Sequence, residues 1–342
     1  MSHPEQVAAS YQSVRRIARR SGSSFYRSFW LLPPVKRRAM DALYAFARVT
    51  DDLGDRDAPV RLRRAQLDWW RRATALNLIG EDEINALVFP DELGAEQLAD
   101  GGQLRTVASE VLPALRDAAV RFGIPSRYLL EIIDGVLADQ QKTRFDTYEQ
   151  VEHYCYLVAS AVGLACLHIW EFEGEVPEAA AIDCGLAFQW TNILRDIAED
   201  AGRGRIYLPR QHYQRHGLTE DDVLQLRRDD RLQHLIVEQI ERTERLYDSG
   251  WEVYESLHRD GRPMFSMMWR TYRRLLSRIA DRPGDVMVRR VSLSRWDKWS
   301  LVASHFFPPA RHRLPMPPAE VRKSRDEPPA NATSQTSPTS DS

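Results

Sequence analysis

Apolar residues recur along this chain at helical spacing almost everywhere, and this periodicity limits the fold more than any other feature. Val7, Tyr11, Val14 and Ala18 follow one another at intervals of four, three and four residues, which places them on one face of a helix. No segment shows the sustained period-two alternation, bounded by turn residues, that indicates half-buried strands. The sequence therefore predicts an all-α fold.

The same pattern sets the expected organisation of the chain. Helical segments are expected over residues 7–18, 36–49, 60–77, 104–121, 126–140, 148–171, 178–200, 219–257 and 263–281. The segment 80–102 is acidic and lacks periodicity, so we expect a loop there. Residues 1–312 are expected to form one helical domain. Residues 313–342 are rich in Pro, Ser and Thr, and we expect them to be a disordered tail.

Composition excludes several classes of protein. Lys and Arg number 47 against 49 Asp and Glu, a net charge of −2, so the chain lacks the basic excess of a nucleic-acid-binding domain. Cys155, Cys166 and Cys184 show no CxxC spacing, which predicts neither a disulfide framework nor a zinc site and favours a reducing cytoplasm. No run of about 18 uninterrupted apolar residues occurs, so no transmembrane helix is expected. We expect a soluble, intracellular, globular protein.

The first 40 residues are far more basic than the chain as a whole. Glu5 is their only acid, and the basic residues are Arg15, Arg16, Arg19, Arg20, Arg27, Lys36, Arg37 and Arg38. Such a segment can mimic a cleaved transit peptide, but residues 21–29 read as part of the fold. The remaining interpretations are a solvated helix face, attraction to phosphate-bearing ligands, and contact with an anionic membrane surface.

Two carboxylate clusters stand out, each near the end of an apolar helical run. The first contains Asp51, Asp52 and Asp55, and Asp51 and Asp55 lie about 40° apart on one helix face. The second steps by four residues along one face and contains Asn192, Asp196 and Asp200, with Gln189 three residues earlier. Like charges at this spacing repel one another, so each arrangement lowers stability unless a cation lies between them.

These oxygen ligands are the type that Mg²⁺ prefers, and Mg²⁺ is usually held by one or two carboxylates together with substrate phosphates. Arg48 and Arg195 accompany the two clusters, which indicates a site that handles anions. The sequence therefore suggests Mg²⁺ ions holding a diphosphate between two helices. The alternative interpretation is that the two clusters form structural ion pairs between helices.

A third pattern is the stripe of Tyr154, Val158 and Val162, spaced four residues apart and followed by Gly163. Its smooth face of small residues could line a channel for a long hydrocarbon. The alternative interpretation is an ordinary part of the core.

Taken together, these motifs resemble those of the squalene/phytoene synthase family of head-to-head prenyl transferases. The resemblance rests on residues 51–55, on residues 189–200 with the run 202–209, on the Ser-Phe motif at residues 21–25 and on residues 154–159. Ser21 stands where some relatives have His, a departure from the family pattern. Within the family, the residues of the second motif and of the Tyr154 helix most resemble those of the bacterial presqualene diphosphate synthase of hopanoid pathways. Phytoene synthases share many of these residues.

The resemblance implies a single-domain helical bundle of the isoprenoid-synthase type around a central cavity. It implies that two farnesyl diphosphates are condensed to presqualene diphosphate. Metal ligands would be Asp51, Asp52, Asp55, Asn192, Asp196 and Asp200. Substrate contacts would be Ser24, Phe25, Arg48, Val158, Val162, Gln189, Asn192, Arg195, Arg205 and Tyr207. Tyr154 matches the tyrosine proposed to assist proton removal, beside the catalytic carboxylates Asp51, Asp55, Asp196 and Asp200.

The implied cofactor is Mg²⁺, with Mn²⁺ as a substitute. No Gly-rich dinucleotide fingerprint follows a strand, so the sequence does not support NADPH. The expected partners are prenyl diphosphates, a downstream reductase of the squalene pathway and a peripheral membrane contact at the inner face. Three alternatives remain open: a phytoene synthase acting on geranylgeranyl diphosphate, a non-catalytic helical scaffold, and a head-to-tail prenyl transferase or terpene cyclase.

Overall fold

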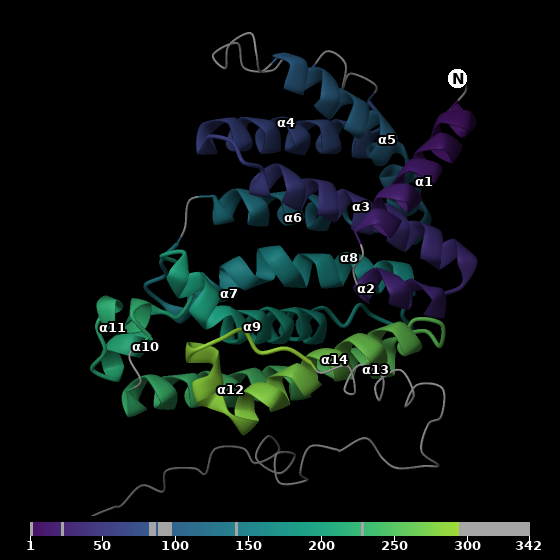
Figure 1. Cartoon of the computed structure of the whole chain (residues 1–342). Helices are drawn as coiled ribbons and strands as arrows, with labels where there is room; N and C mark the ends of the chain where they lie inside the picture. The colour runs from purple at the N-terminus through teal and green to yellow at the C-terminus, as the bar shows by residue number, and fades with distance from the viewer. Residues whose placement is uncertain are drawn as a thin grey trace, which may run out of the picture.

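The computed structural model describes residues 3–21, 24–81, 87, 98–140, 143–226 and 229–293, and every regular element in them is a helix (Figure 1). The one β-type contact in these ranges is an isolated bridge between Phe172 and Leu257. The all-α prediction is therefore confirmed. The predicted tail at 313–342 and two residues of the N-terminal motif, Gly22 and Ser23, lie outside the described residues.

Long helices occupy most of the predicted segments. Their bounds are α1 (His3–Arg20), α3 (Pro34–Asp55), α4 (Val60–Ile79), α5 (Leu98–Phe122), α6 (Ser126–Asp139), α9 (Glu178–Gly202), α12 (Asp230–Gly250) and α14 (Arg262–Asp281). Short helices that the periodicity did not reveal are α2 (Ser24–Arg27), η1 (Ser28–Leu31), α10 (Arg210–Arg215) and η6 (Pro283–Met287). Several starts lie earlier than predicted: α1 begins at His3, α3 begins at Pro34, and α5 begins at Leu98, inside the expected loop.

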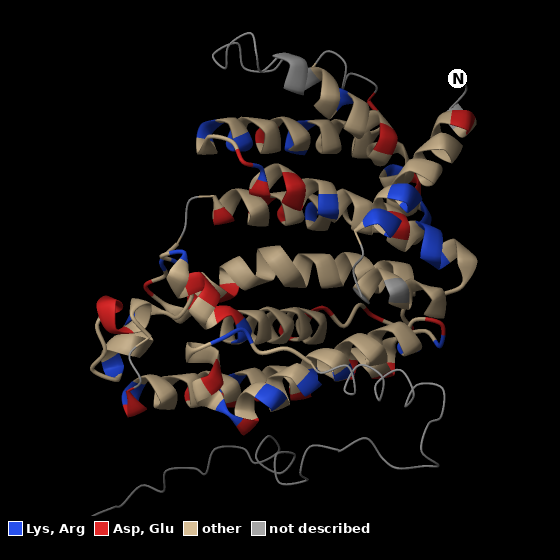
Figure 2. Ribbon diagram, viewed as in Figure 1, with Lys and Arg blue, Asp and Glu red and all other residues tan. Residues whose placement is uncertain are grey.

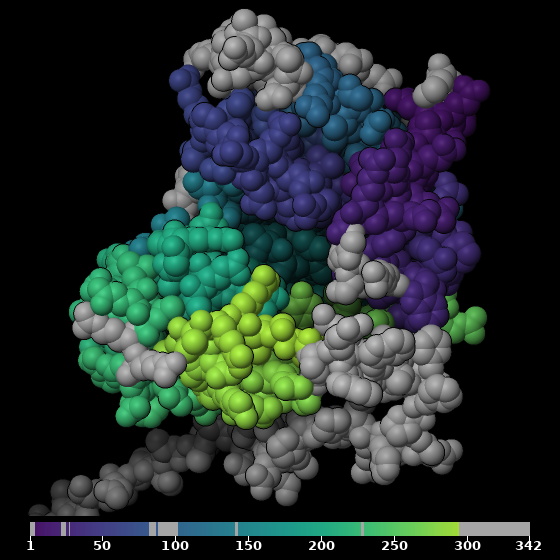
Figure 3. Space-filling view, in the orientation of Figure 1, coloured from purple at the N-terminus to yellow at the C-terminus, as the bar shows by residue number. Residues whose placement is uncertain are grey.

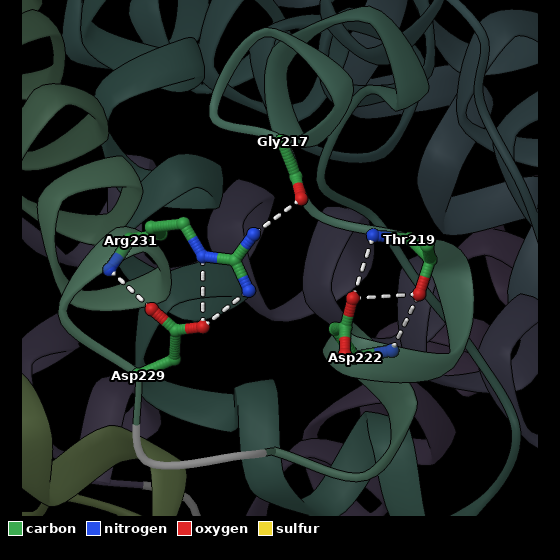
Figure 4. A network of polar contacts seen from close by, with 5 residues as sticks. All are labelled: Gly217, Thr219, Asp222, Asp229 and Arg231. Carbon is green, nitrogen blue, oxygen red and sulfur yellow. Dashed lines mark hydrogen bonds and ion pairs between the residues drawn. The ribbon is translucent and has the colours of Figure 1, made fainter.

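The prediction of one helix over 219–257 is wrong, because two capped starts and a break divide that segment. Thr219 and Asp222 form a reciprocal capping box at the start of α11 (Glu220–Leu224) (Figure 4). Asp229 then caps α12 by accepting a hydrogen bond from the backbone N–H of Arg231 at 2.8 Å. Beyond α12, Trp251 separates it from α13 (Glu252–Ser256).

A continuous helical run extends through α7 (Tyr148–Cys155), a π-helical turn η5 (Tyr156–Ser160) and α8 (Ala161–Trp170). By length and composition this run could cross a membrane, which the sequence analysis did not expect, but 61% of the apolar window is buried inside the fold. A buried core helix has the same length and composition. The run lies between α6 and α9 and contacts both (Figure 1).

Two clusters of buried apolar side chains form the core. The first joins α1, α3, α4, α5, α6 and α8 and contains the fully buried Phe46, Trp69 and Trp70. The second joins α7, α9, α12 and α14 around Trp190 and Tyr247. The helical run α7–η5–α8 contributes side chains to both clusters, so it connects the two halves of the bundle.

The carboxyl ends of α3, α6 and α9 lie on the same side of the molecule, at the left in Figure 1, and red acidic segments mark them in Figure 2. Lys36 fixes the opposite end of α3, because its buried ammonium group donates to the carbonyl oxygen of Trp170 at 2.9 Å and pairs with Glu171 at 2.6 Å. The carboxyl end of a helix carries partial negative charge and favours a cation. This side of the bundle therefore favours the binding of a cation.

Candidate active site

The first carboxylate cluster forms the last turn of α3, and it lies against the end of α6. Gly54 makes this close packing possible, because a Cβ atom there would lie 2.5 Å from Cγ1 of Val136. Gln140 follows α6 and donates from its side-chain amide to the carbonyl oxygen of Gly54 at 3.1 Å. The glycine within the motif is therefore required by the approach of α6 and not by backbone conformation.

Asp51 has a pKa of about 6, well above the ordinary value of 3.8. Removal from bulk water by the surrounding helices is the largest cause, the negative charge of Asp55 is a second, and Arg48 opposes both. Asp51 retains exposed surface, so water screens part of these effects. The last turn of α3 therefore holds concentrated negative charge that a bound cation would relieve.

Asp52 points in a different direction from Asp51 and Asp55. It pairs with Arg48 at 2.5 Å and lines a separate cleft of about 230 Å³ between α3 and α5, with Leu104 and Val107. Both members of this ion pair are about half exposed, so the pair adds little to stability. The assignment of Asp52 as a metal ligand therefore stays a prediction, and this geometry does not group it with its neighbours.

Asp139, the last residue of α6, is the central acceptor of the site, and the sequence analysis missed it. Its Oδ1 accepts hydrogen bonds from the hydroxyl groups of Tyr154 at 3.1 Å and Tyr207 at 2.9 Å. Arg205 approaches its other oxygen at 3.6 Å. The charge of Asp139 also helps to raise the pKa of Asp51. Asp139 thus connects α3, α7 and the segment after α9.

The two tyrosines that donate to Asp139 pack against each other. The rings of Tyr154 and Tyr207 are stacked with their centroids 5.3 Å apart, and Phe145 contacts both. Burial and the nearby carboxylate raise the pKa of each phenol above its ordinary value of 10. Both hydroxyls therefore stay protonated at neutral pH and act as donors toward Asp139.

On α9, the second oxygen-ligand cluster begins with Asn192. The side-chain amide of Asn192 donates to Gln189 at 3.2 Å, which fixes its orientation. Its carbonyl oxygen Oδ1 is buried and has no hydrogen-bond partner among the described residues. A buried acceptor without a partner is costly, so this oxygen is suited to a ligand that the protein binds.

Asp196 lies one turn further along α9, between two arginines. Arg195 donates to both of its oxygens, at 2.8 and 2.5 Å, and Arg290 approaches from the segment after η6 at 2.9 Å. Arg290 also lies 3.5 Å from Glu199. The sequence analysis missed Arg290. Its charge compensates Asp196 in the structure as it stands.

Asp200 completes the cluster on α9, and Arg205 lies between it and Asp139 at the end of α6. The pKa of Asp200 is raised to about 6 by burial and by the charge of Asp196, while Arg205 opposes the shift. Because Arg205 also pairs with Asp139, one guanidinium group lies between the α9 carboxylates and the α6 carboxylate. Asp139 in turn acts on Asp51 through its charge, so the two motifs recognised in the sequence lie in one electrostatically coupled region.

The predicted stripe of Tyr154, Val158 and Val162 is interrupted by the π turn η5, so its four-residue step is not that of an unbroken α-helix. Val158 packs beside the second core cluster and approaches Gly135, whereas Val162 packs beside the first. Both are half-buried. Phe25 packs edge-on against Phe29, with centroids 5.2 Å apart. Ser24 begins α2, and its side chain lies outside the described residues.

The donor set fits a hard divalent cation. Among the described residues, no three His, Cys, Asp or Glu side chains are grouped closely enough to hold a metal by themselves. Mg²⁺ needs no such group when substrate phosphates supply part of its coordination shell. The unpartnered Oδ1 of Asn192, the crowded charges of Asp51 and Asp200, and the helix carboxyl ends all favour a cation here.

The raised carboxylate pKa values predict that the metal-free protein loses stability as the pH rises. A carboxyl group whose pKa is about 6 when folded and 3.8 in its ordinary state binds more protons in the folded protein. Its stabilising contribution is complete below pH 3.8 and is lost as the pH rises through about 6. We therefore expect Asp51→Asn to raise the melting temperature by about 2 °C at neutral pH in a chelating buffer, and to have no such effect in acid.

Asp57→Asn is the control for this prediction, because Asp57 is an exposed aspartate just beyond α3. Plots of melting temperature against pH, from acid to neutral, should run parallel for wild type and the control. If the plot for the Asp51 variant is also parallel to that of wild type, the pKa of Asp51 is not raised in the folded protein.

Comparisons with known proteins show which proteins this chain is similar to. The family model described as squalene/phytoene synthase matches residues 18–297. A phytoene synthase of Arthrospira platensis is 30% identical over 312 residues, covering 87% of this chain and 93% of its own length. A phytoene synthase of Mycobacterium tuberculosis is 32% identical over 302 residues, covering 87% and 91%.

Solved structures share the fold. A dehydrosqualene synthase in complex with a ligand aligns with a TM-score of 0.72 at 24% identity, covering 90% of this chain and 99% of its own. A squalene synthase from Alicyclobacillus acidocaldarius aligns with a TM-score of 0.69 at 24% identity, covering 82% and 97%. The helical architecture is therefore that of these synthases.

Proposed function

The chain belongs to the squalene/phytoene synthase family of prenyl transferases, and we propose that it joins two farnesyl diphosphates head to head. The products are presqualene diphosphate, one diphosphate and one proton. The observation that supports this proposal is the polar network at one end of the bundle. In it, the carboxylates of α3 and α9 lie on either side of Asp139 and Arg205.

Ionisation of the first substrate requires stabilisation of a departing diphosphate. Arg48, Arg195 and Arg205 lie beside the carboxylate clusters and can donate to diphosphate oxygens. Mg²⁺, with Mn²⁺ as a substitute, would be held by Asp51 and Asp55 on α3 and by Asn192, Asp196 and Asp200 on α9. When bound, it supplies positive charge for the leaving group.

The resulting allylic cation must meet the double bond of the second prenyl chain and not water. Val158 in the π turn η5 and Val162 in α8 are half-buried apolar side chains that follow Tyr154 along one helical run, and Tyr154 is almost fully buried. Such a wall excludes water and aligns the reacting carbons. The stripe therefore serves as the surface along which the hydrocarbon chains lie.

Closure of the cyclopropane ring requires loss of a proton from carbon. We assign this step to a relay: the oxygen of Tyr154 takes the proton from carbon while its own hydrogen passes to Oδ1 of Asp139. The electrons of the broken C–H bond form the ring bond, and Asp139 ends protonated. The high pKa of Tyr154 fits this role, because the phenol takes one proton only as it gives another away.

A double-mutant cycle tests the relay. We expect Tyr154→Phe and Asp139→Asn each to lower kcat by about 100-fold, the lower end of the range for general acid–base catalysis. The double variant should lose no more than either single variant, because both remove the same step. Tyr213→Phe, in a buried tyrosine of α10, is the matched control and should leave kcat unchanged. Losses that multiply in the double variant would show that the two residues act independently.

A second candidate is a phytoene synthase acting on geranylgeranyl diphosphate, because the phytoene synthases named above are 30–32% identical over most of this chain. Incubation with each substrate separately, followed by mass spectrometry, distinguishes the two. The proposal predicts a thirty-carbon diphosphate from farnesyl diphosphate. A forty-carbon product from geranylgeranyl diphosphate, with farnesyl diphosphate inert, would establish the second candidate instead.

The proposal includes a cytoplasmic location, with which the three buried free cysteines agree. It also includes a downstream reductase, because conversion of the cyclopropyl diphosphate to squalene requires a hydride donor. Whether a nicotinamide takes part is tested by repeating the incubations with and without NADPH.

A further inference from the structure

Six exposed arginines gather where α1 ends and α3 begins, and the proposed chemistry uses none of them. We call this surface the N-terminal basic face, and its members are Arg15, Arg16, Arg19, Arg20, Arg37 and Arg38. Figure 2 shows the blue segments of α1 and α3 meeting at the right of the molecule, and Figure 3 shows that this region is open to view. Asp41, the acid nearest in sequence, is buried beneath it.

The fold offsets only part of the positive charge of this face, through the buried carboxyl of Asp41, which interacts with the charges of Arg15 and Arg37. Arg37 donates to the carbonyl oxygens of Trp30 and Leu32 at 3.1 and 3.0 Å, and Arg38 lies over the ring of Tyr11 at 4.3 Å. Within the described part of the chain, none of the six arginines forms an ion pair with a carboxylate. Elsewhere arginines are paired closely, as in the contact of Arg144 with Glu220 at 2.7 Å.

Two large apolar side chains are exposed beside these arginines. Trp30 in η1 is 49% exposed and Val35 in the first turn of α3 is 51% exposed. The hydrogen bond from Arg37 to the backbone of Trp30 holds this tryptophan next to the charged groups. Exposed tryptophan with flanking arginines is typical of surfaces that enter the headgroup region of a membrane.

The position of the face suits a membrane contact during catalysis. Arg37 and Asp51 lie at opposite ends of α3, about 20 Å apart at the helical rise of 1.5 Å per residue. A bilayer beneath Arg37 would therefore leave the carboxylate end, with its polar diphosphate chemistry, in water. This arrangement separates the membrane-facing end of α3 from the metal-binding end.

We propose that the N-terminal basic face docks the protein on a bilayer that contains anionic lipid headgroups, with Trp30 and Val35 entering the interface. The arginines contact the lipid phosphates, and the two apolar side chains leave water. The chain as a whole carries a net charge of −2, so attraction to an anionic surface depends on this local concentration of charge. The paired exposed apolar side chains favour a membrane over a nucleic acid.

Flotation of the purified protein with vesicles tests the proposal. We expect binding to vesicles of equal parts phosphatidylglycerol and phosphatidylcholine, weakening as salt is added, and little binding to pure phosphatidylcholine. Each arginine near an anionic surface contributes roughly fivefold to the partition coefficient. Arg16→Gln/Arg19→Gln/Arg20→Gln should therefore lower it by about 100-fold.

The matched control is Arg72→Gln/Arg245→Gln/Arg259→Gln, which removes three exposed arginines from other surfaces. It should bind like wild type, and circular dichroism should show both triple variants folded. Trp30→Ser should lower affinity without changing the salt dependence. Equal loss in both triple variants, equal binding to neutral vesicles, binding abolished by inorganic diphosphate alone, or binding to RNA but not to vesicles would each overturn the proposal.

Discussion

Asp51→Asn should lower kcat by at least 100-fold while leaving the protein folded. The substitution keeps the size of the side chain and removes one negative charge from the last turn of α3, where Asp55 is its close like-charged neighbour. Loss of one charged ligand weakens stabilisation of the departing diphosphate, and effects of this kind cost two to three orders of magnitude in rate. Asp196→Asn, in the cluster on α9, should have a similar effect on the rate.

Folding distinguishes this explanation from structural ion pairing. Asp51 repels Asp55, so its neutralisation should not lower the melting temperature. Asp196 differs because it is paired with Arg195 and Arg290, so its neutralisation should lower stability measurably. Asp57→Asn serves as the control for activity. An Asp51 variant that melts much earlier than wild type, in proportion to its loss of activity, would favour a structural role for the cluster.

Removal of divalent metal should abolish turnover completely. The two carboxylate clusters and the unpartnered oxygen of Asn192 are oxygen donors for a cation. Without that cation, the negative charge of the departing diphosphate is not compensated. Exhaustive chelation should reduce the rate to background, and added Mg²⁺ or Mn²⁺ should restore it. Restoration confirms that the chelator removed a cofactor and did not unfold the protein. Turnover that persists after chelation would contradict this part of the proposal.

The helical architecture and both aspartate motifs could be predicted from sequence, because each is a local pattern. Asp139 could not, since it is a solitary acid whose partners Tyr154 and Tyr207 are distant in sequence and meet it only after folding. Arg290 was missed for the same reason, because it reaches Asp196 from the segment after η6. Both residues act across helices, where spacing along one helix gives no signal.

Other differences had local signals that the periodicity analysis overlooked. The sequence Thr219-Glu220-Asp221-Asp222 has the spacing of a capping box, which marks a helix start inside the segment predicted as one helix. The π turn between Tyr154 and Ala161 has no such marker. It is compatible with close packing against α6 and α9, where Gly135 and Gly185 allow the backbone of η5 to approach.

The proposed reaction joins two prenyl diphosphates and releases only one of their diphosphates. The most direct test is to measure diphosphate released against farnesyl diphosphate consumed, in the presence of Mg²⁺ and without NADPH. The proposal predicts one diphosphate for every two substrates consumed, together with accumulation of a thirty-carbon diphosphate. Release of one diphosphate for every substrate consumed, with no thirty-carbon diphosphate at any time, would contradict it.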